Sequence, residues 1–272
     1  MEVDDVTIMK LSDGTSIYFE DVGNGEPVIF IHGVWMSGRF FEKQIEYFKT
    51  DYRVLIPDLR GHGQSEKIHH GHTIAQYAED IRQFITNLKL ENVTLVGWSM
   101  GAFVIWEYLK LFGDKHIKST VIVDELASDF KWPDFSIGAF DMETLTSFMR
   151  EVQRDQKAFL KGFIPLMFKK ELSLSELDWM LEETTRLPAS VASAILFDQS
   201  VVDYRSSLPD YDIPTLLCFG KEEKLIPVAA GKHLLNALPN AKLHIFEESC
   251  HCPFLEETDV FNKIVDNYIK GL

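Results

Sequence analysis

The stretch Gly97-Trp98-Ser99-Met100-Gly101 decides the fold of this chain. It follows the apolar run 93–96, which suits a buried strand, and it precedes the apolar segment 102–109, which suits a helix. A G-x-S-x-G motif in the order strand, turn, helix predicts a serine on a sharp, strained turn, where its hydroxyl can act as a nucleophile. Glycine is expected at both ends because a side chain there would crowd the crossing strand or helix. The alternative interpretation of Ser99 is an ordinary helix N-cap.

Before and after this motif, predicted strands also alternate with predicted helices along the chain. Strands are predicted at residues 6–11, 16–22, 28–31, 52–57, 121–123, 215–219 and 243–246. Helices are predicted at residues 41–48, 73–88, 228–238 and 260–269. Strands that alternate with helices predict βαβ crossovers, so we expect an α/β fold whose sheet is mostly parallel and flanked by helices.

One segment interrupts the alternation. Residues 125–205 contain no clear strand run, and their aromatic and apolar residues recur at helical spacing, as in Phe159, Phe163 and Met167. We therefore expect two units: a core formed by residues 1–124 and 206–272, and a helical insertion formed by residues 125–205.

The amino-acid composition limits the classes of molecule that the protein is expected to bind. The chain has 272 residues, and its 27 Lys and Arg against 42 Asp and Glu give a net charge of −15. Such an acidic surface argues against nucleic acid or an anionic membrane as a partner. No apolar run reaches the roughly 20 residues of a membrane span, and Met1-Glu2-Val3-Asp4-Asp5 lacks the pattern of a secretory signal. With three cysteines only, the expected location is the cytoplasm.

An activated serine needs a base and an acid that orients the base. His251 lies in a loop between the last predicted strand and the last predicted helix, at the same sheet edge as Ser99. The acid is expected between serine and histidine in chain order. Glu223, after the strand at 215–219, is the first choice. Asp124, after the strand at 121–123, and Glu222 remain alternatives.

The same chemistry needs backbone N–H groups that stabilise an oxyanion. One is expected from Met100, directly after the nucleophile, and the other from Val34 in the loop after the strand at 28–31. We expect the adjacent Trp35 to contact the substrate. Neither His69, His70 and His72 nor Cys250-His251-Cys252 has a spacing suited to joint metal binding, so no metal and no cofactor are predicted.

Five ordered motifs together resemble the α/β-hydrolase superfamily, in particular its bacterial esterase and haloperoxidase-like (perhydrolase-like) branch. They are His32-Gly33, Asp58-Leu59-Arg60-Gly61-His62-Gly63-Gln64-Ser65, the serine motif, Gly220-Lys221-Glu222-Glu223, and His251-Cys252-Pro253-Phe254-Leu255-Glu256. The resemblance implies an eight-stranded sheet with a helical cap between strands six and seven, a triad of Ser99, His251 and Glu223, and an oxyanion hole at Val34 and Met100. The family usually has Asp at the position of Glu223. Members that form peracids often have Pro at the position of Trp35, which argues against that activity here.

These observations lead to a functional hypothesis. The chain is expected to be a cofactor-free serine hydrolase that cleaves a small apolar or aromatic carboxylic ester, or a lactone, through an acyl-enzyme intermediate. A protein of a different class, a small-molecule receptor or signalling protein on the same scaffold, is the alternative. The oligomeric state is not predicted.

Overall fold

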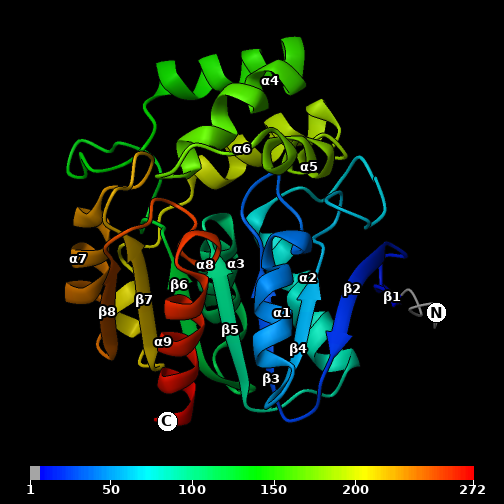
Figure 1. Cartoon of the computed structure of the whole chain (residues 1–272), viewed down its shortest axis with the longest axis vertical. Coiled ribbons are helices and arrows are strands. Elements are labelled where there is room, and N and C mark those ends of the chain that lie inside the picture. The colour runs from blue at the N-terminus through cyan, green and yellow to red at the C-terminus, as the bar shows by residue number, and fades with distance from the viewer. Residues whose placement is uncertain (1–6) are drawn as a thin grey trace.

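A single eight-stranded sheet organises the chain in a computed structural model that describes residues 7–272 (Figure 1). The strand order is β1-β2-β4-β3-β5-β6-β7-β8. Strand β2 pairs antiparallel with both of its neighbours, β1 and β4, and all other neighbouring strands pair parallel. The strands are β1 (Ile8–Lys10), β2 (Ser16–Val22), β3 (Glu26–Ile31), β4 (Tyr52–Pro57), β5 (Val93–Trp98), β6 (Ile117–Val123), β7 (Thr215–Gly220) and β8 (Ala241–Phe246).

Helices cover both faces of the sheet. In Figure 1, α1 and α9 lie on one face, and α2 and α3 lie on the other. Continuous apolar strands such as β5, which is buried along its whole length, suit this two-sided cover. The core helices are α1 (Glu42–Phe48), α2 (Ile74–Asn87), α3 (Met100–Phe112), α7 (Val228–Ala237), α8 (Pro253–Glu256) and α9 (Thr258–Lys270), with short 3-10 turns η1 (Gly38–Phe41) and η3 (Leu208–Asp210).

The central strands end at the same level. Ile31 of β3 pairs with Gly97 of β5, and Gly97 pairs with Ile122 of β6. Val123 of β6 then pairs with Cys218 of β7. The loops that follow β3, β5, β6 and β7 therefore meet at one carboxyl edge, where ligands bind in open α/β sheets.

The segment between β6 and β7 forms a helical layer over this edge (Figure 1). It contains α4 (Met142–Phe163), η2 (Ile164–Met167), α5 (Leu174–Thr184) and α6 (Ala189–Val201). We call residues 125–205 the cap. Helix α4 is broken at Asp155, whose backbone is extended (φ −158°, ψ 86°) and whose carboxylate accepts a hydrogen bond from Ala158 N, as at the start of a new helix.

The predicted elements correspond to the observed ones, with shifted ends. Strand β6 starts at Ile117, four residues before the predicted start. The apolar pattern begins too late because Ser119 and Thr120 are polar, although both are buried. Their hydroxyls pair with Thr94 at 2.9 Å and with Thr215 at 2.8 Å, which satisfies them inside the sheet. The predicted first residue of β1, Val6, and the N-terminal segment 1–5 lie outside the described residues. Within residues 7–272, no helix combines the length and the apolar character that crossing a bilayer requires.

Candidate active site

Ser99 lies between the end of β5 and the start of α3 in a strained backbone conformation (φ 51°, ψ −125°). A Cβ on Gly97 would lie 2.5 Å from the carbonyl oxygen of Gly101. A Cβ on Gly101 would lie 2.2 Å from the carbonyl oxygen of Ile31. The two glycines are therefore required by close backbone approach. The side chain of Ser99 makes no capping hydrogen bond to α3, so the N-cap interpretation is wrong.

His251 and Glu223 form a buried pair at the carboxyl edge of the sheet. His251 Nδ1 lies 2.6 Å from Glu223 Oε2, and the side chains are 4% and 0% exposed. The other carboxylate oxygen of Glu223 accepts hydrogen bonds from the backbone N–H groups of Lys224 (2.7 Å) and Leu225 (2.8 Å). Burial by itself would raise the pKa of Glu223, but the His251 imidazole and backbone donors outweigh it and lower that pKa. Glu223 is therefore a carboxylate that can hold His251 in one tautomer.

The two alternative acids occupy different surroundings. Asp124 is fully buried, and its carboxyl group accepts a hydrogen bond from Gly220 N at 3.0 Å. Burial, followed by the nearby negative charge of Glu223, raises the pKa of Asp124 well above its usual value, which favours the protonated form of Asp124. Glu222 is exposed, with its carboxylate 3.8 Å from the ammonium of Lys169. The geometry at His251 thus favours Glu223.

Asp124, Glu223 and His251 are also the group in the described residues whose ligand atoms could share a metal ion, since these atoms lie within 4.8 Å of one another. Two ligands of one tetrahedral zinc ion, each about 2.0 Å from it, are separated by about 3.3 Å. The 2.6 Å between His251 Nδ1 and Glu223 Oε2 is that of a short hydrogen bond instead. The arrangement suits proton handling better than metal binding.

The loop after β3 passes directly beside the serine. A Cβ on Gly33 would lie only 3.2 Å from Ser99 Cβ. His32 fixes this loop, since its Nδ1 lies 2.9 Å from Gly33 O and its Nε2 accepts a hydrogen bond from Leu59 N at 3.0 Å. Burial lowers the pKa of His32 to about 4, so the ring is neutral and serves as a brace. Val34 follows this braced turn, and Met100 opens α3, where helix N–H groups lack intrahelical partners.

The loop that carries His251 is held from two sides. Trp98 donates its indole N–H to the carbonyl of His251 at 2.9 Å. From the cap, the carbonyl of Met167 accepts a hydrogen bond from His251 N at 3.0 Å. The role of Trp98 is not visible in the sequence, because Trp98 occupies an unrestricted position of the serine motif. Its anchoring partner becomes visible only when β5 and the histidine loop are placed together.

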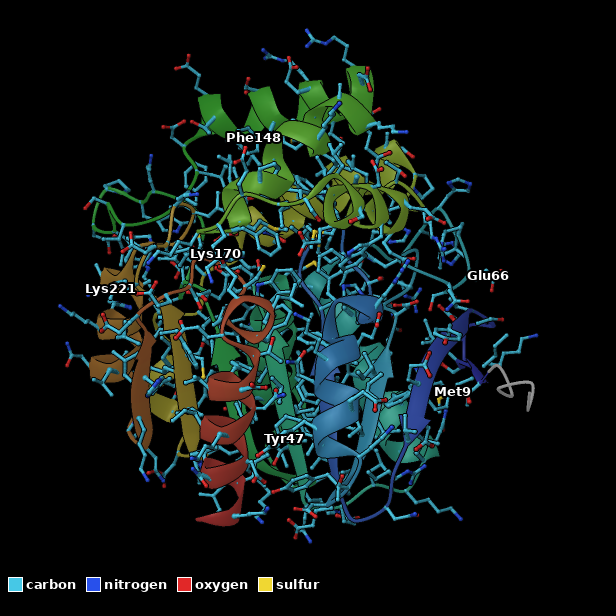
Figure 2. The ribbon with its side chains drawn as sticks, in the orientation of Figure 1. Met9, Tyr47, Glu66, Phe148, Lys170 and Lys221 are labelled. Atoms are coloured by element: carbon cyan, nitrogen blue, oxygen red, sulfur yellow. The ribbon has the colours of Figure 1, made fainter. Side chains whose placement is uncertain are left out.

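Ser99 and His251 line one cavity of about 190 Å³ between the core and the cap. Trp35, which is 2% exposed, lines it too and donates its indole N–H to Ala192 O of α6 at 2.9 Å, which ties the core to the cap. Figure 2 shows Phe148, another lining residue, in the cap above the sheet. The full lining is Val34, Trp35, Ser99, Glu125, Asp129, Ala139, Phe140, Thr144, Phe148, Phe163, Leu196, Gln199, Lys224, Leu225, Ile226 and His251.

Glu125 and Asp129 were missed in the sequence, although they lie just after β6, at the edge where ligands bind. Met100 lies outside the lining, fully buried behind Ser99. The three cysteines, Cys218, Cys250 and Cys252, are free thiols and buried. The thiol of Cys250 lies 3.5 Å from Glu223 Oε1 and therefore packs behind the acid and outside the lining.

Comparison with known proteins supports the α/β-hydrolase fold. A family model described as the alpha/beta hydrolase fold matches residues 26–155. The chain has the α/β-hydrolase fold, and proteins named esterases and haloperoxidases are similar to it over nearly its whole length. It is similar to an esterase from Exiguobacterium antarcticum, with 28% identity, a TM-score of 0.93, and 97% of this chain and 99% of that one covered. A bromoperoxidase from Bacillus anthracis is 29% identical with a TM-score of 0.93, covering 98% and 100%.

A third relative, a non-heme chloroperoxidase from Kitasatospora aureofaciens, is 27% identical over 90% of this chain and 91% of that protein. All three likenesses span nearly the whole chain, so they include the cap as well as the core. The predicted fold class, an eight-stranded α/β-hydrolase sheet with helices on both faces, is confirmed.

Proposed function

We propose that this α/β-hydrolase cleaves a small apolar or aromatic ester or lactone through an acyl-enzyme formed on Ser99. The observation that carries the proposal is the 2.6 Å contact between His251 Nδ1 and Glu223 Oε2, in the same cavity as a serine on a strained turn. The similarity to proteins named esterases supports an ester as the bond attacked. The relatives described above have enzyme names and give no support to a receptor function.

In the first half of the proposed reaction, Ser99 Oγ attacks the carbonyl carbon of the substrate. His251 Nε2 takes the serine proton, while its Nδ1–H donates to the carboxylate of Glu223. The negative charge that develops on the carbonyl oxygen is stabilised by the N–H groups of Val34 and Met100. The intermediate then collapses, the carbon–oxygen bond of the ester breaks, and the leaving alcohol receives the proton from His251.

In the second half, His251 takes a proton from a water molecule that attacks the acyl group on Ser99. The same N–H groups stabilise the second oxyanion, and the proton returns to Ser99 as the carboxylic acid leaves. Every proton is carried by a group of the chain or by water. Glu223 stays ionised throughout because its lowered pKa favours the carboxylate beside the imidazolium.

The cavity sets the size and polarity of the proposed substrate. About 190 Å³ is below the ordinary range of pockets for drug-sized ligands, so a small acyl group is expected. Trp35, Phe140, Phe148 and Phe163 supply aromatic walls. Their rings favour an aliphatic or aromatic group by area burial and edge contacts.

The test is hydrolysis of phenyl esters and lactones of graded acyl length by the wild type, Ser99→Ala and Ser147→Ala. Ser147 is an exposed serine of α4 and provides a matched control. We expect turnover that falls as the acyl chain outgrows the cavity, that is lost in Ser99→Ala, and that is unchanged in Ser147→Ala. Equal turnover by wild type and Ser99→Ala would refute the proposal.

A further inference from the structure

Two acids in the wall of the catalytic cavity are not used by the reaction above. Glu125 and Asp129 are 1% and 2% exposed, and both line the cavity together with Gln199, which is 3% exposed. Burying such groups is costly unless they are paired with a charge or fully hydrogen-bonded. Their presence beside the nucleophile therefore calls for a ligand or a partner.

The hydrogen bonds inside the chain leave this cluster incompletely paired. Glu125 Oε1 accepts a hydrogen bond from Leu126 N at 2.7 Å, and Asp129 Oδ2 accepts one from Gln199 Nε2 at 2.9 Å. Within residues 7–272, no N–H or hydroxyl group donates to Asp129 Oδ1, and none donates to Gln199 Oε1. Two buried acceptors, on side chains that line the cavity, thus have no hydrogen-bond donor among the described residues.

The cluster also holds an unbalanced charge. Burial raises the pKa of Glu125 well above its usual value, and the neighbouring Asp129 raises it further. Burial also raises the pKa of Asp129, to about 6, against the hydrogen bonds from Glu125 and Gln199. With a pKa of about 6, Asp129 is largely ionised at neutral pH, and the raised pKa of Glu125 favours the protonated form beside it.

The cations near the cavity are already engaged. His251 is the positively chargeable group that lowers the pKa of Asp129, and its Nδ1 is bound to Glu223. Lys224 also lines the cavity, but its ammonium donates to the carbonyl of Phe168 at 2.6 Å and it is not among the groups that shift the pKa of Asp129. The negative charge of Asp129 is thus left to be balanced by a ligand.

The remaining walls suit a cation as well. Trp35 and Phe163 are in edge contact with ring centroids 5.4 Å apart, and Phe140 and Phe148 are in edge contact at 5.5 Å. Aromatic faces attract cations, and the attraction grows in a site shielded from water. An ammonium group offers one positive charge and up to three N–H donors, which fits one carboxylate, one free amide oxygen and an aromatic surround.

We propose that Glu125, Asp129 and Gln199 form a subsite for a protonated amine, so that the preferred substrates are small esters that carry an ammonium group. This inference rests on the proposed ester hydrolysis at Ser99 and specifies its substrate class. Asp129 carries the charge, Glu125 adds a second carboxyl group beside it, and Gln199 presents its carbonyl oxygen to the bound N–H.

The experiment measures binding separately from turnover. Phenethylammonium chloride and 2-phenylethanol, which differ in the ammonium and hydroxyl group, are titrated calorimetrically into the wild type, Asp129→Asn, Glu125→Gln and Asp178→Asn. Asp178 is an exposed acid of α5 and gives the same change of charge on the cap surface. Hydrolysis of phenyl acetate by the same proteins reports on the proposed function.

We expect the wild type to bind phenethylammonium at least about tenfold more tightly than 2-phenylethanol, in line with a charge-assisted hydrogen bond. Asp129→Asn should lose this preference while keeping its affinity for the alcohol. Asp178→Asn should keep the preference. Equal affinity of the wild type for both probes, or a preference that survives in Asp129→Asn, would overturn the subsite. Absence of phenyl acetate turnover with intact amine binding would instead refute the ester reaction alone.

Discussion

Two buried carboxyl groups at the catalytic cavity, Glu223 behind His251 and Asp129 in the lining, differ in what balances their charge. Glu223 faces the imidazole of His251 at 2.6 Å, and the pKa of the acid is lowered although its side chain is fully buried. Asp129 faces another carboxyl group, and its pKa is raised to about 6. Glu223 and Asp129 are similarly buried, so the neighbouring group decides the direction of the pKa shift. Glu223 stabilises the imidazolium of His251, whereas Asp129 has no such cation paired with it within residues 7–272 and is proposed to bind one from a ligand.

The largest effect is expected when the charge of Glu223, the acid paired with His251, is removed. In Glu223→Gln, the amide NH₂ can donate to His251 Nδ1 and favour the tautomer with the proton on Nε2, which cannot accept the serine proton. We expect kcat to fall by about 10⁴-fold, as when other triad acids become amides. Steady-state kinetics on phenyl acetate measures it.

Asp124→Asn is the matched control, because the raised pKa of Asp124 favours its neutral form and the amide can still accept the hydrogen bond from Gly220 N. We expect a change in kcat below about tenfold. If Asp124→Asn abolished activity and Glu223→Gln did not, the orienting acid would be Asp124.

A second prediction disturbs the loop that supplies an oxyanion donor. In Gly33→Ala the new Cβ would lie 3.2 Å from Ser99 Cβ, so the loop must shift away from the serine. We expect kcat to fall by about 10²-fold, the scale of losing one oxyanion donor. Val34→Ala keeps the backbone N–H and should stay within about threefold. A larger loss in Val34→Ala than in Gly33→Ala would remove this loop from the oxyanion hole.

A third prediction concerns the effect of Asp129 on the free energy of unfolding. The pKa of Asp129 is raised in the folded state, so the native protein keeps a proton that the unfolded chain loses between about pH 4 and pH 6. The free energy of unfolding therefore falls across this window as pH rises. Asp129→Asn removes the effect and should be more stable than wild type by on the order of 2 kcal/mol at pH 8.

Urea denaturation of both proteins at about pH 5 and about pH 8 measures this difference. The gain in Asp129→Asn should be smaller at the lower pH. A variant that is less stable than the wild type at pH 8 would show that the chain itself, and not a ligand, balances the carboxylate.

The smallest effect concerns the anchor of the histidine loop. Trp98→Phe keeps an aromatic ring beside Phe254, whose centroid lies 4.9 Å away, but removes the 2.9 Å hydrogen bond to His251 O. We expect kcat to fall by about tenfold, since one hydrogen bond at a positioned base contributes about 1 kcal/mol. KM for phenyl acetate should change little. An unchanged kcat would mean that the cap contact at Met167 holds the loop alone.

The comparison also separates what a sequence can predict from what it cannot. The sheet follows from apolar runs, and Ser99, Glu223 and His251 follow from motifs that each end a strand. Glu125 and Asp129 belong to no motif, and their importance depends on burial and on the absence of a cation, which are properties of packing. Trp98 was missed for the same reason, because its partner lies 153 residues away in the chain.

The central claim is that Ser99 is the nucleophile, and covalent labelling tests it most directly. The wild type and Ser99→Ala are treated with a fluorophosphonate, and the modified peptide is mapped by mass spectrometry. We predict one adduct on Ser99 in the wild type, slower labelling in Glu223→Gln, and none in Ser99→Ala. An unlabelled wild type, or an adduct that persists in Ser99→Ala, would contradict the account.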